Sequence, residues 1–214
     1  MPCMDTTDLA ELTARARRFA VPGTRHVLGI AGAPGAGKST LAARLVDSLE
    51  GRAVLVPMDG FHLAGAELDR LGRAGRKGAP DTFDAAGYVA LLRRLRNPEG
   101  PGPVYAPAFD RSLEEPIAGA VPVPGGIPLV VTEGNYLLLD EEPWAAVRGL
   151  LDEVWFLDPD PGLRVRRLVE RHVRFGKPRP QAERWVAVSD EPNARLVERG
   201  RDRADLVVRV GDMP

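Results

Sequence analysis

The sequence predicts an α/β protein in which a parallel, five-stranded sheet carries helices on both faces. Short apolar segments alternate with longer segments of helical periodicity, which is typical of βαβ units. The first apolar segment, 26–31, runs into a glycine-rich loop, and the segments at 53–57, 129–132 and 153–157 each lead into an acidic residue. Right-handed crossovers bring the carboxyl ends of such strands to one edge of the sheet, so we expect the loop, Asp59 and Glu133 to meet there.

The composition limits the classes of protein that fit. With 214 residues, we expect the whole chain, 1–214, to form one domain with a full core. The net charge of −1 gives no sign of a nucleic-acid partner, and no apolar run approaches the ~18 residues of a membrane span. Cys3 is the single cysteine, and no signal-peptide pattern occurs, so the sequence favours a reduced, cytoplasmic setting. Of the 29 basic residues only three are lysines, and all three lie in glycine-flanked segments: Lys38, Lys77 and Lys177.

The first elements lead up to the glycine-rich loop. Residues 1–23 predict a helical appendage, capped by Asp5 or Asp8. Strand 26–31 follows, and a helix over 38–49 has leucines at four-residue spacing. Segment 53–57 is apolar throughout, which predicts a strand buried on both faces.

The loop between the first strand and its helix has the pattern Gly-x-x-x-x-Gly-Lys-Ser. Its glycines let several backbone N–H groups point into one anion-sized hollow, to which the helix N-terminus adds positive potential. We expect a nucleoside triphosphate to bind here, with Lys38 on the outer phosphates and the Ser39 hydroxyl available to Mg²⁺. The predicted nucleotide-binding residues are Gly32, Gly35, Ala36, Gly37, Lys38, Ser39 and Thr40. The alternative is a glycine-rich turn with an incidental lysine.

An acid, Asp59, follows the second strand. A carboxylate at this edge of an open α/β sheet is placed for chemistry, whereas the alternative is that Asp59 only caps a helix over 63–71. A basic, glycine-rich loop over 72–80 comes next. Arg76 and Lys77 can hold an anionic or hydroxyl-rich substrate there, and the alternative is a solvated loop.

A helix capped by Asp84 precedes segment 99–128, which is rich in proline and glycine. We expect this segment to be a largely irregular insertion on the substrate side, with at most a short hairpin formed by 104–105 and 117–123. Polar side chains on such loops are candidates for substrate contact, and for the charged ones surface pairing is the alternative. The candidates are Tyr105, Asp110 and Arg111.

The third apolar segment, 129–132, predicts a buried strand that ends in Glu133. An acid in the strand beside the phosphate-binding loop is placed to ligand Mg²⁺ directly or through water. The next strand, 153–157, is followed by Asp158, the third acid at a strand end.

A helix over 161–175, capped by Asp160, carries an arginine stripe. Four arginines fall on one face of this helix. Their like charges repel one another unless an anion or carboxylates neutralise them. The alternative is that this face is simply exposed to solvent. The four arginines are Arg164, Arg167, Arg171 and Arg174. The remainder predicts a helix around Trp185, a cap at Ser189-Asp190, a helix over 193–199 and a last strand over 205–210.

Four motifs in order resemble the phosphoribulokinase/uridine kinase/pantothenate kinase family. They are Gly32-Ala-Pro-Gly-Ala-Gly-Lys-Ser39, Met58-Asp-Gly-Phe-His62, Lys77-Gly-Ala-Pro-Asp-Thr-Phe-Asp84 and Thr132-Glu-Gly-Asn-Tyr136. The resemblance covers about residues 24–210 and implies a P-loop kinase fold with ATP and Mg²⁺ as cofactors. It implies that Asp59 matches the acid proposed as catalytic base and Glu133 the family's second acid, with either one as the main base, and that helices over 160–190 form a lid.

The predicted catalytic residues are Asp59, Lys38, Arg167 and Arg171, and the predicted substrate-binding residues are Asp59, His62, Lys77, Tyr105, Arg111, Glu133 and Asn135.

The resemblance implies a kinase that phosphorylates a hydroxyl group of a nucleoside, a pantothenate-like compound or a sugar. Segment 77–84 is similar to bacterial pantothenate kinase, but that enzyme's long N-terminal extension is missing, and segment 109–111 is only loosely similar to the uridine kinase Tyr-Asp-Phe segment. The acceptor is therefore not carried over, and a homodimer is left open. One alternative is a regulatory GTPase-like module, disfavoured because no Asn-Lys-x-Asp segment occurs. The other is a phosphate-loop module that binds nucleotide without transfer.

Overall fold

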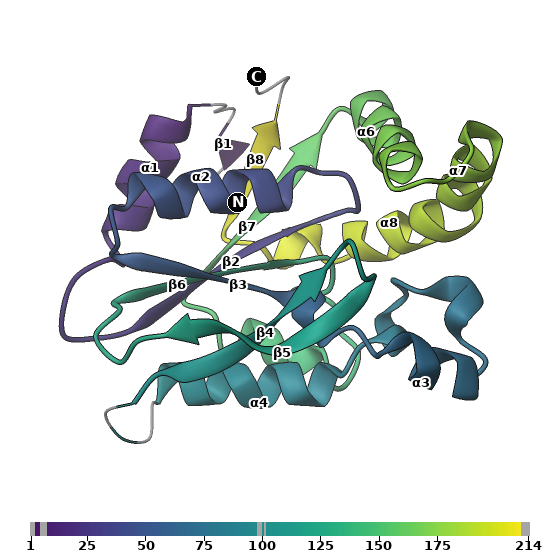
Figure 1. Ribbon diagram of the computed structural model, residues 1–214. Coiled ribbons are helices and arrows are strands. Elements are labelled where there is room, and N and C mark those ends of the chain that lie inside the picture. Colours follow the sequence, from purple (N-terminus) through teal and green to yellow (C-terminus); the bar gives the residue numbers. More distant parts are fainter. Residues whose placement is uncertain (1–2, 5–7, 98–99, 101, 211–214) are drawn as a thin grey trace.

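The centre of the protein is a six-stranded parallel sheet (Figure 1). The computed structural model describes residues 3–4, 8–97, 100 and 102–210. In spatial order the strands are β1 (Cys3–Met4), β8 (Leu206–Val210), β7 (Glu153–Pro159), β2 (His26–Gly32), β6 (Leu129–Gly134) and β3 (Ala53–Pro57). The five predicted strands are all present, which confirms the α/β fold, and the two-residue β1 extends the sheet beyond β8.

Helices cover both faces of this sheet (Figure 1). One face carries α1 (Leu9–Arg17) and α2 (Lys38–Ser48), and the other carries α4 (Ala85–Arg96), α5 (Ala145–Arg148) and α8 (Glu191–Glu198). The α1 cap is Asp8, whose carboxylate accepts a hydrogen bond from the Ala10 amide at 2.8 Å; Asp5, the other predicted cap, lies outside the described residues.

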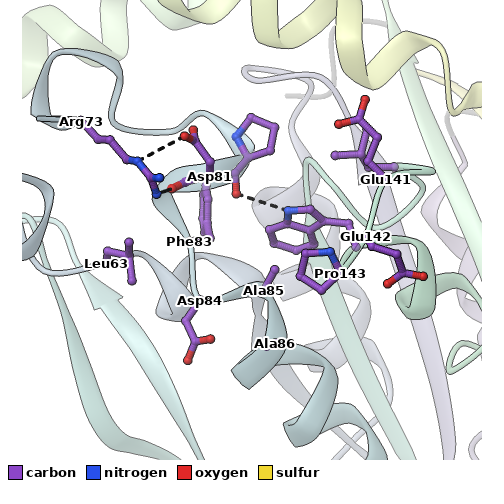
Figure 2. Close-up of a pocket in the computed structure, with 13 residues that line it drawn as sticks. Leu63, Arg73, Asp81, Phe83, Asp84, Ala85, Ala86, Glu141, Glu142 and Pro143 are labelled. Carbon is purple, nitrogen blue, oxygen red and sulfur yellow. Dashed lines mark hydrogen bonds and ion pairs between the residues drawn. The ribbon is translucent and has the colours of Figure 1, made fainter. Parts of the chain in front are cut away.

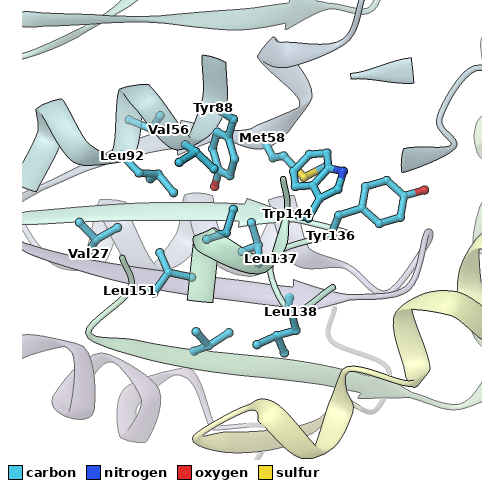
Figure 3. Close-up of a cluster of buried hydrophobic side chains, with 14 of the residues drawn as sticks. Val27, Val56, Met58, Tyr88, Leu92, Tyr136, Leu137, Leu138, Trp144 and Leu151 are labelled. Carbon is cyan, nitrogen blue, oxygen red and sulfur yellow. The ribbon is translucent and has the colours of Figure 1, made fainter. Parts of the chain in front are cut away.

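Alternate residues of the central strands enter two separate cores, one on each face. In β2, Val27 and Ala31 belong to the core under α4, while Leu28 and Ile30 belong to the core under α1 and α2. Figure 3 shows part of the first core, where aromatic rings from three segments meet around Trp144.

The prediction that segment 53–57 is buried on both faces is wrong. β3 is the edge strand next to β6, and Val54, Leu55 and Pro57 are only half-buried. An apolar run alone does not distinguish an edge strand from a central one.

The register of the parallel strands determines which residues lie together at the carboxyl edge of the sheet. Glu133 of β6 pairs with Ile30 of β2 on one side and with Pro57 of β3 on the other. Asp59 follows two residues after Pro57, in a 3₁₀ turn over Met58–Phe61. Both acids therefore lie beside the loop that follows β2.

The proline-rich insertion is more regular than predicted. β4 (Val104–Asp110) and β5 (Glu115–Val123) form an antiparallel two-stranded ribbon outside the main sheet. A two-stranded ribbon has two unpaired edges, which tolerate proline because no neighbouring strand needs its N–H. The ribbon packs on the turn after β3: a Cβ on Gly60 would collide with the Pro107 carbonyl group, so only glycine allows this approach.

The remaining helices are α3 (Gly65–Arg70), α6 (Pro161–Arg174) and α7 (Arg179–Trp185), and further 3₁₀ turns cover Ala74–Arg76, Pro80–Thr82 and Arg201–Arg203. Helix α3 is shorter than the predicted 63–71, because its first amide, at Gly65, is capped by the Glu115 carboxylate of the ribbon. The predicted caps are confirmed at Asp84 on α4 and at Asp160 on α6.

The predicted cap at Ser189-Asp190 is wrong. A π-helical segment, Val186–Asp190, joins α7 to α8 without a break. The Asp190 carboxylate is engaged by His172 Nε2 at 2.8 Å instead of by a helix N-terminus. None of the helices in the described ranges has the length and apolar character needed to cross a bilayer.

Candidate active site

A cavity of about 320 Å³ opens at the carboxyl edge of the sheet. Its wall comes from the phosphate-binding loop, the ends of β3 and β6, the loop between α3 and α4, the turn of the ribbon, and α6 to α8. Ten predicted site residues line it: Gly35, Lys38, Ser39, Asp59, His62, Lys77, Arg111, Glu133, Asn135 and Arg171.

The phosphate-binding loop has the backbone that its glycines predict. Gly35 and Gly37 have φ angles of 80° and 92°, in the left-handed region that glycine enters without strain. A Cβ on Gly35 would also lie 2.7 Å from Leu168 Cγ, so this glycine allows α6 to pack against the loop. The other predicted loop residues, Gly32, Ala36, Gly37 and Thr40, do not line the cavity.

Lys38 begins α2 and is almost fully buried. Its ammonium group donates to the Ala33 carbonyl oxygen at 3.1 Å and to Asn135 Oδ1 at 2.7 Å. Burial lowers the pKa of Lys38 to about 8, although the nearby Glu133 and Asp59 carboxylates oppose this. The ammonium is thus held in place but poorly solvated, so additional negative charge in the cavity would stabilise it.

Glu133 is buried beside the start of α2 and accepts a hydrogen bond from Ser39 Oγ at 2.8 Å. Burial, followed by the negative charge of Asp59, raises the pKa of Glu133. A hydroxyl and a carboxylate oxygen are the kind of ligands that Mg²⁺ takes together with substrate phosphates, and a cation would offset the two neighbouring acids. Ser39 and Glu133 therefore fit a magnesium ion. In the described ranges, no group of three or more His, Cys, Asp and Glu side chains could hold a metal without such phosphates.

Asp59 is partly exposed at the mouth of the cavity, where Arg111 Nη2 lies 3.1 Å from its Oδ2 atom. The alternative interpretation of Asp59 as a helix cap is wrong: α3 begins six residues later, at Gly65, and has no side-chain cap at its N-cap residue, Ala64. Its carboxylate is held by the ribbon and not by a helix.

His62 anchors the turn that carries Asp59. Its Nδ1 donates to the Asp59 carbonyl oxygen at 2.8 Å, and its ring lies between Phe83 and Phe109, with centroids 4.0 and 4.7 Å away. Burial lowers the pKa of His62, so the neutral imidazole is favoured. The arrangement fits a residue that fixes the backbone of the turn.

The four arginines of α6 occupy different environments. Arg164 donates to the Pro34 carbonyl oxygen and pairs with Glu191 at 2.5 Å, while Arg174 is exposed. Arg171 lines the cavity, and burial, followed by the positive charge of Arg111, lowers its pKa. Arg167 does not line the cavity, but its Nη1 lies 3.8 Å from the position that a Cβ of Gly37 would occupy. The alternative of a solvent-exposed arginine face therefore holds for Arg174 but not for Arg164 or Arg171.

Some predicted residues are not brought to the cavity. Tyr105 lies on the outer side of β4 with 56% of its surface exposed, because its neighbour Ala106 takes the buried side. Arg76 pairs with Asp81 outside the cavity. Asp158, the third acid at a strand end, pairs with Arg201.

Other residues line the cavity that were not among the predicted site residues, although Pro34, Gly78 and Phe83 lie within the quoted motifs. They are Pro34, Ala74, Gly78, Phe83, Phe109, Glu114, His172, Phe175, Lys177, Trp185, Asp190 and Asn193. Two aromatic rings each carry a lysine: Lys77 Nζ lies 5.1 Å from the Phe109 centroid, and Lys177 Nζ lies 5.3 Å from the Trp185 centroid. The signal that could have found Lys177 was the scarcity of lysine in the chain.

A second hollow, of about 430 Å³, lies between the start of α4 and the segment 139–144 (Figure 2). Its acids are already engaged or exposed to solvent: Asp81 accepts from Arg73, and Asp84 caps α4. Trp144 also lines this hollow, and its indole N–H donates to the Pro80 carbonyl oxygen at 3.3 Å. None of the predicted site residues lines this hollow.

The sequence model of the phosphoribulokinase/uridine kinase family matches residues 27–213 of this chain. The chain is also similar to "Putative uridine kinase C227.14" of Schizosaccharomyces pombe, with 31% identity over 216 residues that cover 96% of this chain and 92% of that protein. It is 28% identical over 193 residues to the ATP-dependent kinase YFH7 of Lachancea thermotolerans, covering 72% of this chain and 56% of the yeast protein.

A similar solved structure is that of a "putative fructose transport system kinase" from Silicibacter sp. TM1040. It has a TM-score of 0.85 and 35% identity, over 94% of this chain and 99% of that one.

Proposed function

The chain belongs to the phosphoribulokinase/uridine kinase family, and on that premise we propose that it transfers the γ-phosphoryl group of ATP to a hydroxyl group of a small molecule. The observation that supports this most directly is the convergence of Lys38, Ser39, Asp59, Glu133 and Arg171 on one cavity. The acceptor class is a nucleoside, a pantothenate-like compound or a sugar.

The phosphates of ATP bind on the loop that ends at Lys38. Backbone amides and the N-terminus of α2 favour negative charge there, and the buried ammonium group adds a full positive charge. Ser39 and Glu133 would hold the magnesium ion, which when bound neutralises charge on the β- and γ-phosphates.

Asp59 is the general base in this proposal. Its carboxylate accepts the proton of the acceptor hydroxyl while that oxygen bonds to the γ-phosphorus and the bond to the bridging oxygen of ADP breaks. Arg111 holds the carboxylate at the mouth of the cavity until the acceptor arrives. Arg171, which lacks a carboxylate at ion-pair distance within the described chain, offsets charge on the transferred group.

The test measures ADP release by the wild-type protein with Mg-ATP and a panel of nucleosides, pantothenate and sugars. We expect at least one acceptor to stimulate release and to yield a phosphorylated product. The Asp59→Asn variant should lose this activity, whereas the control Asp158→Asn, which removes a strand-end acid outside the cavity, should keep it. Nucleotide binding without any acceptor-dependent release would instead support a regulatory nucleotide-binding module.

A further inference from the structure

We propose that the acceptor carries an anionic group, a carboxylate or a phosphate, in addition to its hydroxyl, and that Lys77 and Lys177 bind this group. The inference rests on the proposed function and narrows its acceptor class. It is carried by the distribution of lysine in the chain and by the surroundings of these two ammonium groups.

All three lysines of the chain line the one cavity. The other 26 of the 29 basic residues are arginines, so every lysine of the chain lies in the wall of this cavity. An ammonium group is a compact charge on a flexible stem that can turn its donors toward a ligand, whereas a guanidinium group is larger and planar. Lys38 is assigned to the nucleotide phosphates in the proposed function, so Lys77 and Lys177 are available to bind a different ligand.

Lys177 has no carboxylate to pair with in the part of the chain that the structure describes. Its ammonium group lies over the Trp185 ring, at 5.3 Å from the centroid, in the turn between α6 and α7. The backbone of this turn is fixed, because the Lys177 amide donates to the His172 carbonyl oxygen at 3.0 Å. An aromatic face holds a cation without neutralising it, so the charge stays available.

Lys77 is held in a similar way on a different segment. Its ammonium group lies over Phe109 and donates to the Glu114 carbonyl oxygen. The nearest carboxylate, that of Glu114, is 4.0 Å away, and its side chain is 57% exposed, so water weakens the pair.

Of the other charges in the cavity, Arg171 is assigned to the transferred phosphoryl group, and two more have close partners. Arg111 pairs with Asp59 at 3.1 Å, and His172 contacts Asp190 at 2.8 Å. A neutral nucleoside or sugar would leave both lysines without an anion, whereas a carboxylate or phosphate would pair with them. Because Lys77 and Lys177 come from separate segments, such an anion would also join the loop after α3 to the turn after α6.

The test compares acceptors in which a neutral hydroxyl group takes the place of the anion: pantothenate with pantothenol, glycerate with glycerol, and fructose 6-phosphate with fructose. In at least one pair we expect the anionic member to have a kcat/KM at least 10-fold higher, and the pair that responds distinguishes carboxylate from phosphate. Lys77→Met and Lys177→Met should each raise the KM for that acceptor about 10- to 100-fold, the usual loss for a hydrogen bond to a charged group, with kcat nearly unchanged. The control, Arg76→Gln, removes the neighbouring cation outside the cavity and should leave KM within about twofold.

A neutral nucleoside or sugar with the highest kcat/KM, or an unchanged KM in both lysine variants, would overturn the inference and leave the kinase proposal standing. If none of the compounds is phosphorylated, binding of the anionic compounds in the presence of Mg-ADP is measured by calorimetric titration. Binding that both lysine variants lose would support the anion site and overturn phosphoryl transfer; absence of binding would overturn the anion site as well. If a methionine variant does not fold, the corresponding Lys77→Gln or Lys177→Gln variant is tested in its place. Melting curves check that this variant is folded.

Discussion

Replacing Lys38 with methionine should stabilise the empty protein at neutral pH while removing its activity. Methionine has a similar length but no charge, so it removes the buried ammonium group and leaves the start of α2 filled. The pKa of Lys38 is lowered from 10.5 to about 8 by burial, which means that the folded state binds its proton less tightly than the unfolded state does. Below pH 8 both states are protonated, and folding carries the full penalty.

The size of the effect follows from this difference. At 1.36 kcal/mol per pH unit, a change from 10.5 to about 8 disfavours the charged folded state by about 3 kcal/mol. Methionine also lacks the two hydrogen bonds that the Lys38 amine, charged or neutral, donates to Ala33 and Asn135, and this loss costs the variant about 2 kcal/mol. At pH 7 we therefore expect Lys38→Met to unfold with a free energy about 1 kcal/mol higher than that of the wild type.

The sign should reverse in alkali. As the pH rises from about 8 to 10.5, the folded wild type loses the proton that the unfolded chain still keeps, so its stability rises and the advantage of the variant disappears. Urea unfolding of both proteins at pH 7 and pH 10 measures this, because titrating groups that do not interact with Lys38 are common to both and cancel in the difference. We expect the difference to change by about 2 to 3 kcal/mol. If the stability difference between the variant and the wild type is the same at both pH values, the conclusion that the Lys38 ammonium group is buried and poorly solvated is refuted. Turnover should fall at least about 10²-fold at either pH.

Three further predictions concern single side chains. Asp59→Asn should lower turnover about 10²- to 10⁴-fold in a steady-state assay, with nucleotide affinity and melting temperature nearly unchanged, because the carboxylate caps no helix; a lower melting temperature with normal turnover would contradict this. Arg171→Gln should lower turnover by about 10²-fold or more and leave the empty protein as stable or slightly stabler, whereas Arg174→Gln, on the exposed side of the same helix, should change neither. Asp84→Ala should lower the free energy of unfolding by about 1 kcal/mol through loss of the α4 cap, with turnover unchanged; urea unfolding that shows no loss would mean that the cap hydrogen bond is weak.

The phosphate-binding loop and the strand-end acids could be predicted because their signals are local. A glycine-rich loop between a strand and a helix specifies its own backbone, and the parallel order of the strands then brings Asp59 and Glu133 beside it. The caps at Asp84 and Asp160 are local for the same reason, since each side chain bonds an amide three residues later.

The rest of the cavity depends on contacts between distant segments. Lys177 and Asn193 join Lys77 in the wall of the cavity only after α6, α7 and α8 fold over the sheet edge, and no short motif carries that information. The predicted cap at Asp190 failed because the local preference of aspartate for helix ends is outweighed by its contact with His172, 18 residues away in sequence. The side of β4 that Tyr105 takes was likewise set by packing, because its neighbours Val104 and Ala106 enter the core under α4.

The confinement of lysine to the cavity gives the protein a natural set of chemical labels. Reagents that acylate or reductively methylate amines would modify, apart from the α-amino group, only Lys38, Lys77 and Lys177. Reductive methylation with ¹³C-formaldehyde would thus place its side-chain NMR probes at the start of α2, on the segment between α3 and α4, and on the turn between α6 and α7. Occupancy of the cavity could then be followed in the otherwise unmodified protein, without introducing cysteines or fluorophores.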